Sequence, residues 1–429
     1  MSKMNITKTA AAVLLAGLLT AGCSSPVYLP ADETDAVPAV PFTYTESDDS
    51  IPPGNAQSND DMLYHGGYIY IMPGDKQPVY RYNVKTGNVT CMCQDPLCMH
   101  DTEECPLYGL RLQFYITADG ELCFYRQFGS MNLSATGMLI DVEHFNDFVL
   151  YDMEKQKIRV LESYGNTAGF MPELYIGDYR YYNGQVYDAE TDESEWGLMR
   201  MELSTGEREW FGAGTDDDGN AVPVEDSYPC FVLGERLYFQ DALGIFSLNM
   251  DGEDRREHAP LGRTEADGIR TDGEYLYYRN DGCLLRTPID GGEEELLADG
   301  GVTDFCLTEN WLTYETGGEV VLGKAEIYGY AGNEVVLVGG EIHRCRHDGS
   351  EDTAVFTFDG ELAGTRPVGM IVEGNYMYCG YVQWTDADGD GIYRDGDSVS
   401  SMAINGKETC TMLRIDLTTG ETMVIEVIS

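Results

Sequence analysis

The chain has 429 residues, with 74 acidic side chains against 27 Lys and Arg and a formal net charge of −47. A chain of this charge repels nucleic acid and anionic lipid head groups, which excludes both as partners held by charge. A hydrophobic content of 43%, with 29 Tyr, excludes a chain that is disordered throughout.

The first 22 residues predict an export signal that ends at a lipidation site. Lys3 and Lys8 precede an apolar run over residues 10–19, and small residues lead from it to Cys23. The run is too short to span a bilayer, which needs roughly 20 apolar residues. The pattern resembles a bacterial lipoprotein signal, which implies that Cys23 becomes the lipidated first residue of the mature chain. We therefore expect a lipid anchor in the cell membrane and a location outside the cytoplasm. The alternative is an ordinary secretory signal in which Cys23 is an incidental thiol.

Residues 23–60 predict a disordered tether. The segment is rich in Pro, Asp, Glu, Ser and Asn and has little apolar periodicity. Such a composition cannot bury enough apolar surface to fold, so we expect it to lift the rest of the chain away from the bilayer.

From residue 61 onward, one unit recurs seven times. Each unit has an aromatic strand and then an alternating strand that ends in a Gly turn followed by an acid. Period-two alternation buries one face of a strand, and Thr-Gly or Asp-Gly supplies the positive φ that a tight hairpin requires. The aromatic strands are centred on Tyr68–Tyr70, Leu122–Tyr125, Tyr179–Tyr182, Leu237–Phe239, Tyr275–Tyr278, Trp311–Tyr314 and Tyr376–Tyr378.

Seven such units predict an all-β fold in which residues 61–429 form a seven-bladed β-propeller. A unit of four short strands cannot bury its faces alone, and closure into a ring removes the exposed sheet edges. The rival fold is two stacked β-sandwiches, which does not predict one motif repeated seven times. The last unit holds four strand candidates of its own, which favours closure by packing. Residues 42–44 could still add a strand.

The repeats and the signal together resemble a group of surface lipoproteins of anaerobic Gram-positive bacteria. Their propeller is similar to that of low-density-lipoprotein-receptor-related proteins. The resemblance implies the fold and the location, and it implies no particular activity.

A cysteine-rich segment follows the first unit. Cys91 and Cys93 are followed by Cys98, His100 and Cys105. Three thiolates and one imidazole, from Cys93, Cys98, His100 and Cys105, match the donor set of a tetrahedral zinc site. Outside the cytoplasm, cysteines this close in sequence also pair as disulfides, and reduced thiols are the third possibility.

A second candidate metal site lies in the last unit. Asp386, Asp388, Asp390 and Asp397 take the first, third, fifth and twelfth positions of a calcium loop, and Ile392 offers a backbone carbonyl at the seventh. This spacing supplies the oxygen ligands that calcium prefers. We expect a structural calcium ion on a hairpin insertion, and the alternative is a solvated acidic turn.

A third candidate is the segment His343–His347. On a strand, His343, Cys345 and His347 share one face, so they could bind a transition metal. The alternative is that they are polar core residues with hydrogen-bond partners.

The sequence shows no serine-hydrolase elbow and no His-Glu-x-x-His zinc motif. The pattern therefore favours a ligand-binding or protein-binding scaffold at the cell surface. Two alternatives are a surface hydrolase of glycan or peptide that uses channel-facing carboxylates, and a metal or redox sensor that uses the Cys/His segment.

Overall fold

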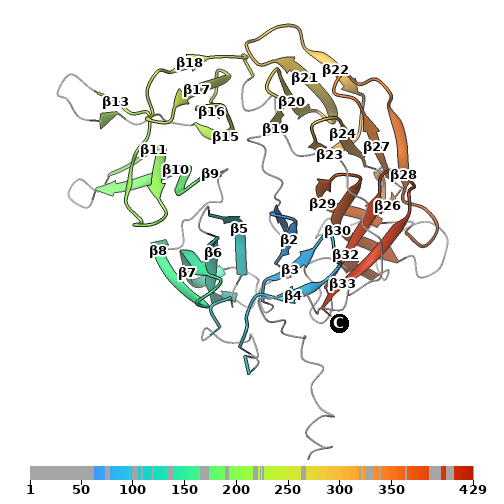
Figure 1. The fold of residues 1–429 in the computed structure, drawn as a ribbon, viewed down its shortest axis with the longest axis horizontal. Coiled ribbons are helices and arrows are strands. Elements are labelled where there is room, and N and C mark those ends of the chain that lie inside the picture. Colours follow the sequence, from blue (N-terminus) through green and yellow to red (C-terminus); the bar gives the residue numbers. More distant parts are fainter. Residues whose placement is uncertain are drawn as a thin grey trace, which may run out of the picture.

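The computed structural model describes most of the repeat region. The described residues are 62–72, 78–95, 97–98, 105–107, 110–117, 120–133, 139–164, 173–188, 193–215, 221–222, 224, 227–261, 267–317, 320–324, 333–337, 340–362, 365–385, 398–401 and 410–428. Seven antiparallel sheets stand side by side around a ring (Figure 1), each with four strands in chain order from the centre outward. The predicted seven-bladed β-propeller is confirmed, and the stacked-sandwich alternative is wrong.

The first four blades follow one pattern, and each uses a continuous stretch of chain. Their strands are β1 (Met62–His65), β2 (Tyr68–Ile71), β3 (Tyr80–Asn83) and β4 (Val89–Cys91); β5 (Leu110–Ile116), β6 (Leu122–Leu133), β7 (Leu139–Asp152) and β8 (Lys157–Tyr164); β9 (Glu173–Ile176), β10 (Tyr179–Asp188), β11 (Glu193–Glu202) and β12 (Arg208–Trp210); and β15 (Tyr228–Leu233), β16 (Arg236–Gln240), β17 (Ile245–Asn249) and β18 (Arg256–Glu257). A separate pair, β13 (Gly214–Thr215) and β14 (Ala221–Val222), follows the third blade.

The last three blades keep the pattern, and the sixth and seventh add insertions. Their strands are β19 (Asp267–Thr271), β20 (Tyr275–Asn280), β21 (Cys283–Pro288) and β22 (Glu295–Ala298); β23 (Val302–Leu307), β24 (Leu312–Thr316), β27 (Glu341–Cys345) and β28 (Thr353–Thr357), with the inserted pair β25 (Val320–Lys324) and β26 (Asn333–Leu337); and β29 (Thr365–Glu373), β30 (Tyr376–Thr385), β32 (Cys410–Asp416) and β33 (Thr422–Ile428), with β31 (Ser398–Ser401) paired to β30. A 3-10 turn, η2 (Gly360–Leu362), precedes the seventh blade.

The ring closes by packing between the seventh blade and the first. In the described residues, each of these two blades is built from its own strands, and none is exchanged. The rings of Tyr82 in β3 and Tyr378 in β30 lie 5.9 Å apart and belong to one buried apolar cluster with Ile69 and Ile371. Residues 42–44, which could add a strand, lie outside the described residues.

The turns between the third and fourth strands explain the repeated Thr-Gly and Asp-Gly pairs. In the first blade, the Asn83 side chain accepts hydrogen bonds from the backbone NH groups of Lys85 and Thr86, and Gly87 has a φ of +75°. Such a φ costs glycine nothing, whereas a Cβ disfavours it. The turn of the second blade has no glycine, and Gln156 takes this position with a φ of +56°.

A repeated arginine, which the repeat pattern did not reveal, fastens five of the blades. It lies on the third strand, opposite the Tyr-x-Tyr strand, and its guanidinium sits over the first aromatic ring of that strand. We call these five residues the arginine clamps. They are Arg81 over Tyr68 at 4.9 Å, Arg200 over Tyr179 at 5.1 Å, Arg286 over Tyr275 at 4.3 Å, Arg344 over Trp311 at 4.7 Å and Arg414 over Tyr376 at 4.8 Å.

Three clamps also reach the next blade. Arg200 donates to the backbone oxygen of Met250 at 3.0 Å, and Arg286 donates to that of His347 at 2.9 Å. Arg344 donates to the backbone oxygen of Gly374 at 3.3 Å. A cation over an aromatic ring and a charged donor on a carbonyl each stabilise a protein by roughly 1–2 kcal/mol, so each of these three clamps fixes one blade against its neighbour.

We expect Arg286→Ala to lower the free energy of unfolding by about 2 kcal/mol, because it removes both the contact with Tyr275 and the bond to the sixth blade. Thermal unfolding followed by circular dichroism measures the change. The control is Arg256→Ala, an exposed arginine on β18, which we expect to alter stability by less than about 0.5 kcal/mol. Equal effects of the two substitutions would contradict the role assigned to the clamp.

Candidate metal centre

Three cysteine side chains converge after β4, where the chain passes from the first blade to the second. The Sγ atoms of Cys93, Cys98 and Cys105 all lie within 4.8 Å of one another. We call these three residues the thiol cluster. Within the described residues it is the one group of three or more His, Cys, Asp or Glu side chains with ligand atoms this close. The predicted fourth ligand, His100, lies outside the described residues.

A tight turn folds the middle cysteine back towards the first. The side chain of Asp95 accepts a hydrogen bond from the backbone NH of Leu97 at 2.9 Å. The backbone oxygen of Asp95 accepts one from the NH of Cys98 at 3.1 Å. These two hydrogen bonds to Asp95 therefore set the position of Cys98.

The second blade holds the start of the loop in place. Tyr151 on β7 donates its hydroxyl hydrogen to the backbone oxygen of Met92 at 3.2 Å. Gln156, in the turn between β7 and β8, accepts a hydrogen bond from the backbone NH of Gln94 at 2.8 Å. The thiol cluster therefore lies at the contact between the first two blades, close to the β7–β8 turn.

Burial makes two thiols of this segment, those of Cys105 and Cys91, poor acids on their own. Cys93 and Cys105 are 2% and 1% exposed, and Cys98 is half-buried. The hydrogen bond with Cys93 and burial raise the pKa of the Cys105 thiol well above its usual range. Burial also raises the pKa of the nearby Cys91 thiol to about 12. A bound cation would reverse this tendency, since a coordinating thiol is deprotonated by its metal.

The ten described cysteines form no disulfide with one another. The Sγ atoms of Cys93 and Cys105 lie 4.0 Å apart. A disulfide requires about 2.05 Å, so these two sulfurs are not bonded to each other, and metal binding stays a prediction.

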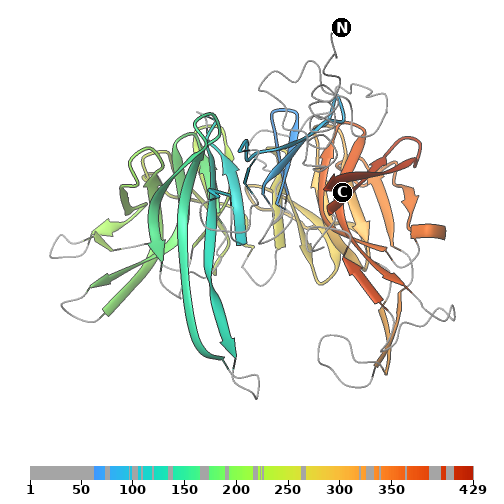
Figure 2. The ribbon, with the colours of Figure 1, turned by 90° about the horizontal axis from the view of Figure 1, so that it is seen from below.

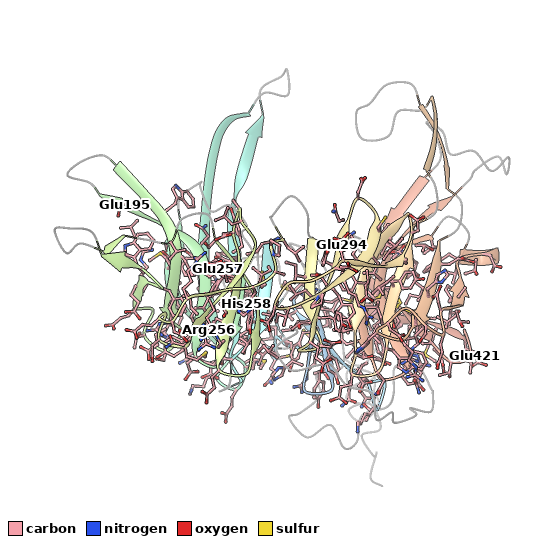
Figure 3. The ribbon with its side chains drawn as sticks, turned by 90° about the horizontal axis from the view of Figure 1, so that it is seen from above. Glu195, Arg256, Glu257, His258, Glu294 and Glu421 are labelled. Carbon is pink, nitrogen blue, oxygen red and sulfur yellow. The ribbon has the colours of Figure 1, made fainter. Side chains whose placement is uncertain are left out.

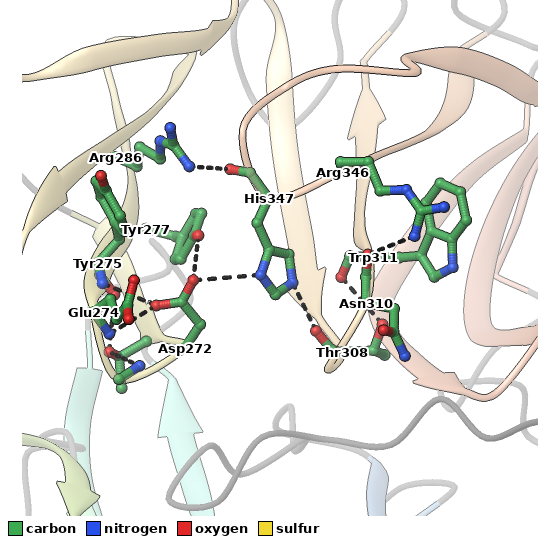
Figure 4. A network of polar contacts seen from close by, with 12 residues as sticks. Asp272, Glu274, Tyr275, Tyr277, Arg286, Thr308, Asn310, Trp311, Arg346 and His347 are labelled. Carbon is green, nitrogen blue, oxygen red and sulfur yellow. Dashed lines mark hydrogen bonds and ion pairs between the residues drawn. The ribbon is translucent and has the colours of Figure 1, made fainter.

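The segment His343–His347 is built differently, and its three side chains do not form a metal site. His343 stacks on Tyr314 with the ring centroids 4.9 Å apart. The ring of His347 lies between two blades (Figure 4), with Nδ1 3.3 Å from an Asp272 carboxylate oxygen and Nε2 2.8 Å from the backbone oxygen of Thr308. The alternative of polar core residues with hydrogen-bond partners is the one that the structure supports.

A Ser-His-Asp arrangement between the fourth and fifth blades has no signal in the sequence. The hydroxyl of Ser247 lies 2.8 Å from Nε2 of His258, and Nδ1 of that ring lies 3.0 Å from a carboxylate oxygen of Asp290. The burial is the reverse of a hydrolase triad, because Ser247 is 0% exposed and the Asp290 side chain is 85% exposed. Arg236 also donates to the Ser247 hydroxyl at 2.8 Å. We interpret the arrangement as a structural link between β17, β18 and the fifth blade.

A pair of half-buried acids joins the second and third blades. Arg180, only 1% exposed, lies 3.8 Å from a carboxylate oxygen of Glu162 and donates through Nε to Glu173 at 3.0 Å. Tyr125 also donates to Glu173 at 2.6 Å. Glycoside hydrolases hold two carboxyls apart across a substrate, whereas these two share one buried guanidinium. This pair therefore serves the contact between blades.

The predicted calcium ligands Asp386, Asp388, Asp390, Ile392 and Asp397 lie outside the described residues, as does Cys23. The strands on both sides of the calcium segment pair with each other, with Thr385 opposite Ser398. This pairing is what a hairpin insertion in the seventh blade requires, and calcium binding stays a prediction.

Comparisons with known proteins show similarity in fold alone. No protein-family model matches the chain, and no curated protein matches it. The propeller domain of the Trilobed protease from Pyrococcus furiosus is 10% identical over 90% of this chain and 97% of its own, with a TM-score of 0.41. An acylaminoacyl peptidase from Pyrococcus horikoshii is 13% identical over 75% of this chain, with a TM-score of 0.41. TolB from Acinetobacter baumannii is 12% identical over 66% of this chain, with a TM-score of 0.34.

The chain spans 61% of the length of the TolB chain and 49% of the peptidase chain. Among the described residues, no helix has the length and apolar character needed to cross a membrane.

The contact between Asp272 and His347 predicts a pH effect on stability. Burial alone would raise the pKa of Asp272, but hydrogen bonds from His347, Tyr277 and two backbone NH groups hold it well below its usual range. A depressed pKa stabilises the fold above the unfolded-state value of about 4, and this contribution is lost as the pH falls below it.

We expect Asp272→Asn to cost about 2 kcal/mol at pH 7 and to differ less and less from the wild type as the pH falls below about 4. Melting temperatures measured from pH 7 to pH 3 give the comparison. Asp251→Asn, in an exposed turn, is the control. A constant difference between Asp272→Asn and the wild type across this range would contradict the assignment.

Proposed function

We propose that the protein is a lipid-anchored, extracytoplasmic propeller that binds an extracellular ligand or protein through one face of its ring. The observation that carries the proposal is the set of extended hairpins on that face. Four blades lengthen or add to the connection between their second and third strands, whereas the turns on the opposite face are short. Rigid scaffolds commonly present binding residues in this way, on segments that extend from a closed framework.

The hairpins of the second and third blades form because their second and third strands are longer than those of the first blade. β6 and β7 have 12 and 14 residues, and β10 and β11 have 10 each, against 4 residues in each of β1, β2 and β3. Figure 2 shows the β6–β7 hairpin and the β25–β26 pair projecting from the same side of the ring. We call this side the hairpin face. The opposite side, which carries the short turns between third and fourth strands, is the turn face.

The hairpin of the third blade offers a side chain suited to binding. Trp196 on β11 is 44% exposed, opposite Gln185 on β10. Its neighbour Glu195 lies far out on this hairpin in Figure 3. Tryptophan is enriched among the residues that dominate binding energies, since it offers a large apolar area with few rotatable bonds.

The anchor follows from the N-terminal sequence. The signal over residues 1–22 and Cys23 support lipidation, and residues 23–60 are long enough to hold the ring off the membrane. A net charge of −47 opposes contact between the ring and anionic head groups, which leaves the acyl chains as the membrane contact.

The hydrolase alternative has less support. It requires an accessible nucleophile or two opposed carboxyls. The Ser247 hydroxyl is buried, and Glu162 and Glu173 share Arg180. Binding without turnover is therefore the function that we propose.

We expect Cys23→Ala to move the protein from the detergent phase to the aqueous phase in a Triton X-114 partition of the producing cells, because acyl chains are the proposed membrane contact. Cys283→Ala, a half-buried cysteine on β21, is the control and should leave the partition unchanged. Retention of Cys23→Ala in the detergent phase would contradict the lipid anchor.

We expect the hairpin face to carry most contacts with partners. Replacing residues 185–196 by Asn-Gly shortens the third-blade hairpin while Gly184 and Gly197 stay opposite each other. Chemical cross-linking on intact cells, followed by mapping of the linked residues, should show partner links near this hairpin in the wild type and their loss in the variant.

Glu309→Ala, in an exposed turn on the turn face, is the matched control and should keep the links. A melting temperature within a few degrees of wild type shows that the shortened variant is folded. Partner links that concentrate on the turn face would contradict the proposal.

A further inference from the structure

We propose that the thiol cluster binds one zinc ion, and that this ion fastens the second blade to the first. The inference is independent of the proposed function, because it rests on Cys93, Cys98 and Cys105 and not on the hairpin face. The fourth ligand position is left unassigned.

The sulfur positions fit a metal better than a disulfide. Zinc–thiolate bonds of about 2.3 Å at tetrahedral angles place two sulfurs about 3.8 Å apart. The Sγ atoms of Cys93 and Cys105 are 4.0 Å apart, and all three sulfurs lie within 4.8 Å of one another. A disulfide would join two of them and leave the third sulfur beside the bond without a function. Three sulfurs gathered around one point are what a soft or borderline cation requires.

The three cysteines of the cluster differ in how deeply they are buried. Cys93 and Cys105 lie inside the apolar cluster, and half-buried Cys98 packs against its edge. Two ligands are therefore shielded from solvent, and the third lies where an ion can enter. Cys93 and Cys105 are 12 residues apart in the sequence. A metal ion that binds both therefore closes a short loop, at a modest cost in chain entropy.

The position of the cluster indicates what the ion would do. One buried apolar cluster contains Cys93 and Cys105 together with Tyr82 of the first blade, Tyr151 of the second and Tyr378 of the seventh. The ring closes here by packing alone, since the described residues show no strand exchanged between the first and last blades. The seventh blade packs against one side of the first blade. A metal that fixes the β4–β5 connection would hold the first blade on the side that faces the second blade.

The cluster is placed away from the proposed ligand contacts. Gln94 binds Gln156 in the β7–β8 turn, at the opposite end of β7 from the long β6–β7 hairpin. The thiol cluster therefore lies beside the β7–β8 turn and away from the tip of the β6–β7 hairpin. This separation assigns the ion a structural role and not a role in contacting the ligand.

The test measures zinc directly. The full chain is purified in mild detergent with a thiol reductant and without chelator, and its zinc is measured by inductively coupled plasma mass spectrometry. We expect about one zinc per chain in the wild type. Cys93→Ala and Cys105→Ala should weaken zinc affinity by more than about 100-fold, since even second-shell changes cost 10- to 100-fold.

Two matched controls separate coordination from packing. Cys91→Ala removes a buried thiol two residues from Cys93 that is not a member of the cluster, and Cys123→Ala removes one in the second blade. Both variants should keep the zinc. Cobalt substitution should give thiolate-to-cobalt absorption in the wild type and in both controls, and not in Cys93→Ala.

A stability readout completes the experiment. A chelator should lower the melting temperature of the wild type by about 5 °C and leave that of Cys105→Ala unchanged, because only the wild type has an ion to lose. A wild-type chain that holds no zinc after this purification would overturn the proposal. Equal zinc content in Cys93→Ala and the wild type would also overturn it.

Discussion

The arginine clamps connect neighbouring blades, and the rest of the ring depends on these connections. A blade cannot bury both faces of its sheet by itself, so the fold is stable only where blades meet. Each clamp places a guanidinium over the first ring of the aromatic strand, and Arg200, Arg286 and Arg344 then reach a backbone oxygen of the next blade. Because the chain has 27 Lys and Arg against 74 acids, it has few cations to place at these contacts.

The two faces of the ring differ in what their connections do, and the contacts of the clamps with neighbouring blades lie on one of them. Arg200 reaches the turn that follows β17, and Arg286 reaches the turn that follows β27, so both fasten the turn face. The hairpins of β6–β7 and β10–β11 extend from the other face, where their length is not needed to close the ring. Changes in the hairpins can therefore alter what is bound while the contacts that hold the ring remain.

Much of the fold could be predicted from the sequence, because its determinants are local. A Tyr-x-Tyr strand and a Thr-Gly turn lie within a few residues of each other, and their recurrence fixes the number of blades. The clamps could not be predicted in this way. Arg286 looks like the polar residue of an alternating strand, and its partners Tyr275 and His347 lie on another strand and on another blade. Only the folded ring brings these groups together.

The same distinction explains which parts of the candidate site were predictable. Cys93, Cys98 and Cys105 lie within 13 residues of sequence, so their spacing alone suggested that they bind one metal ion. The turn at Asp95 helps to bring their sulfurs together. Ser247, His258 and Asp290 belong to two blades, and no spacing rule joins them. Their geometry imitates a catalytic triad, yet burial of the hydroxyl removes the access that a nucleophile needs. In this chain, exposure rather than geometry separates a structural network from a reactive one.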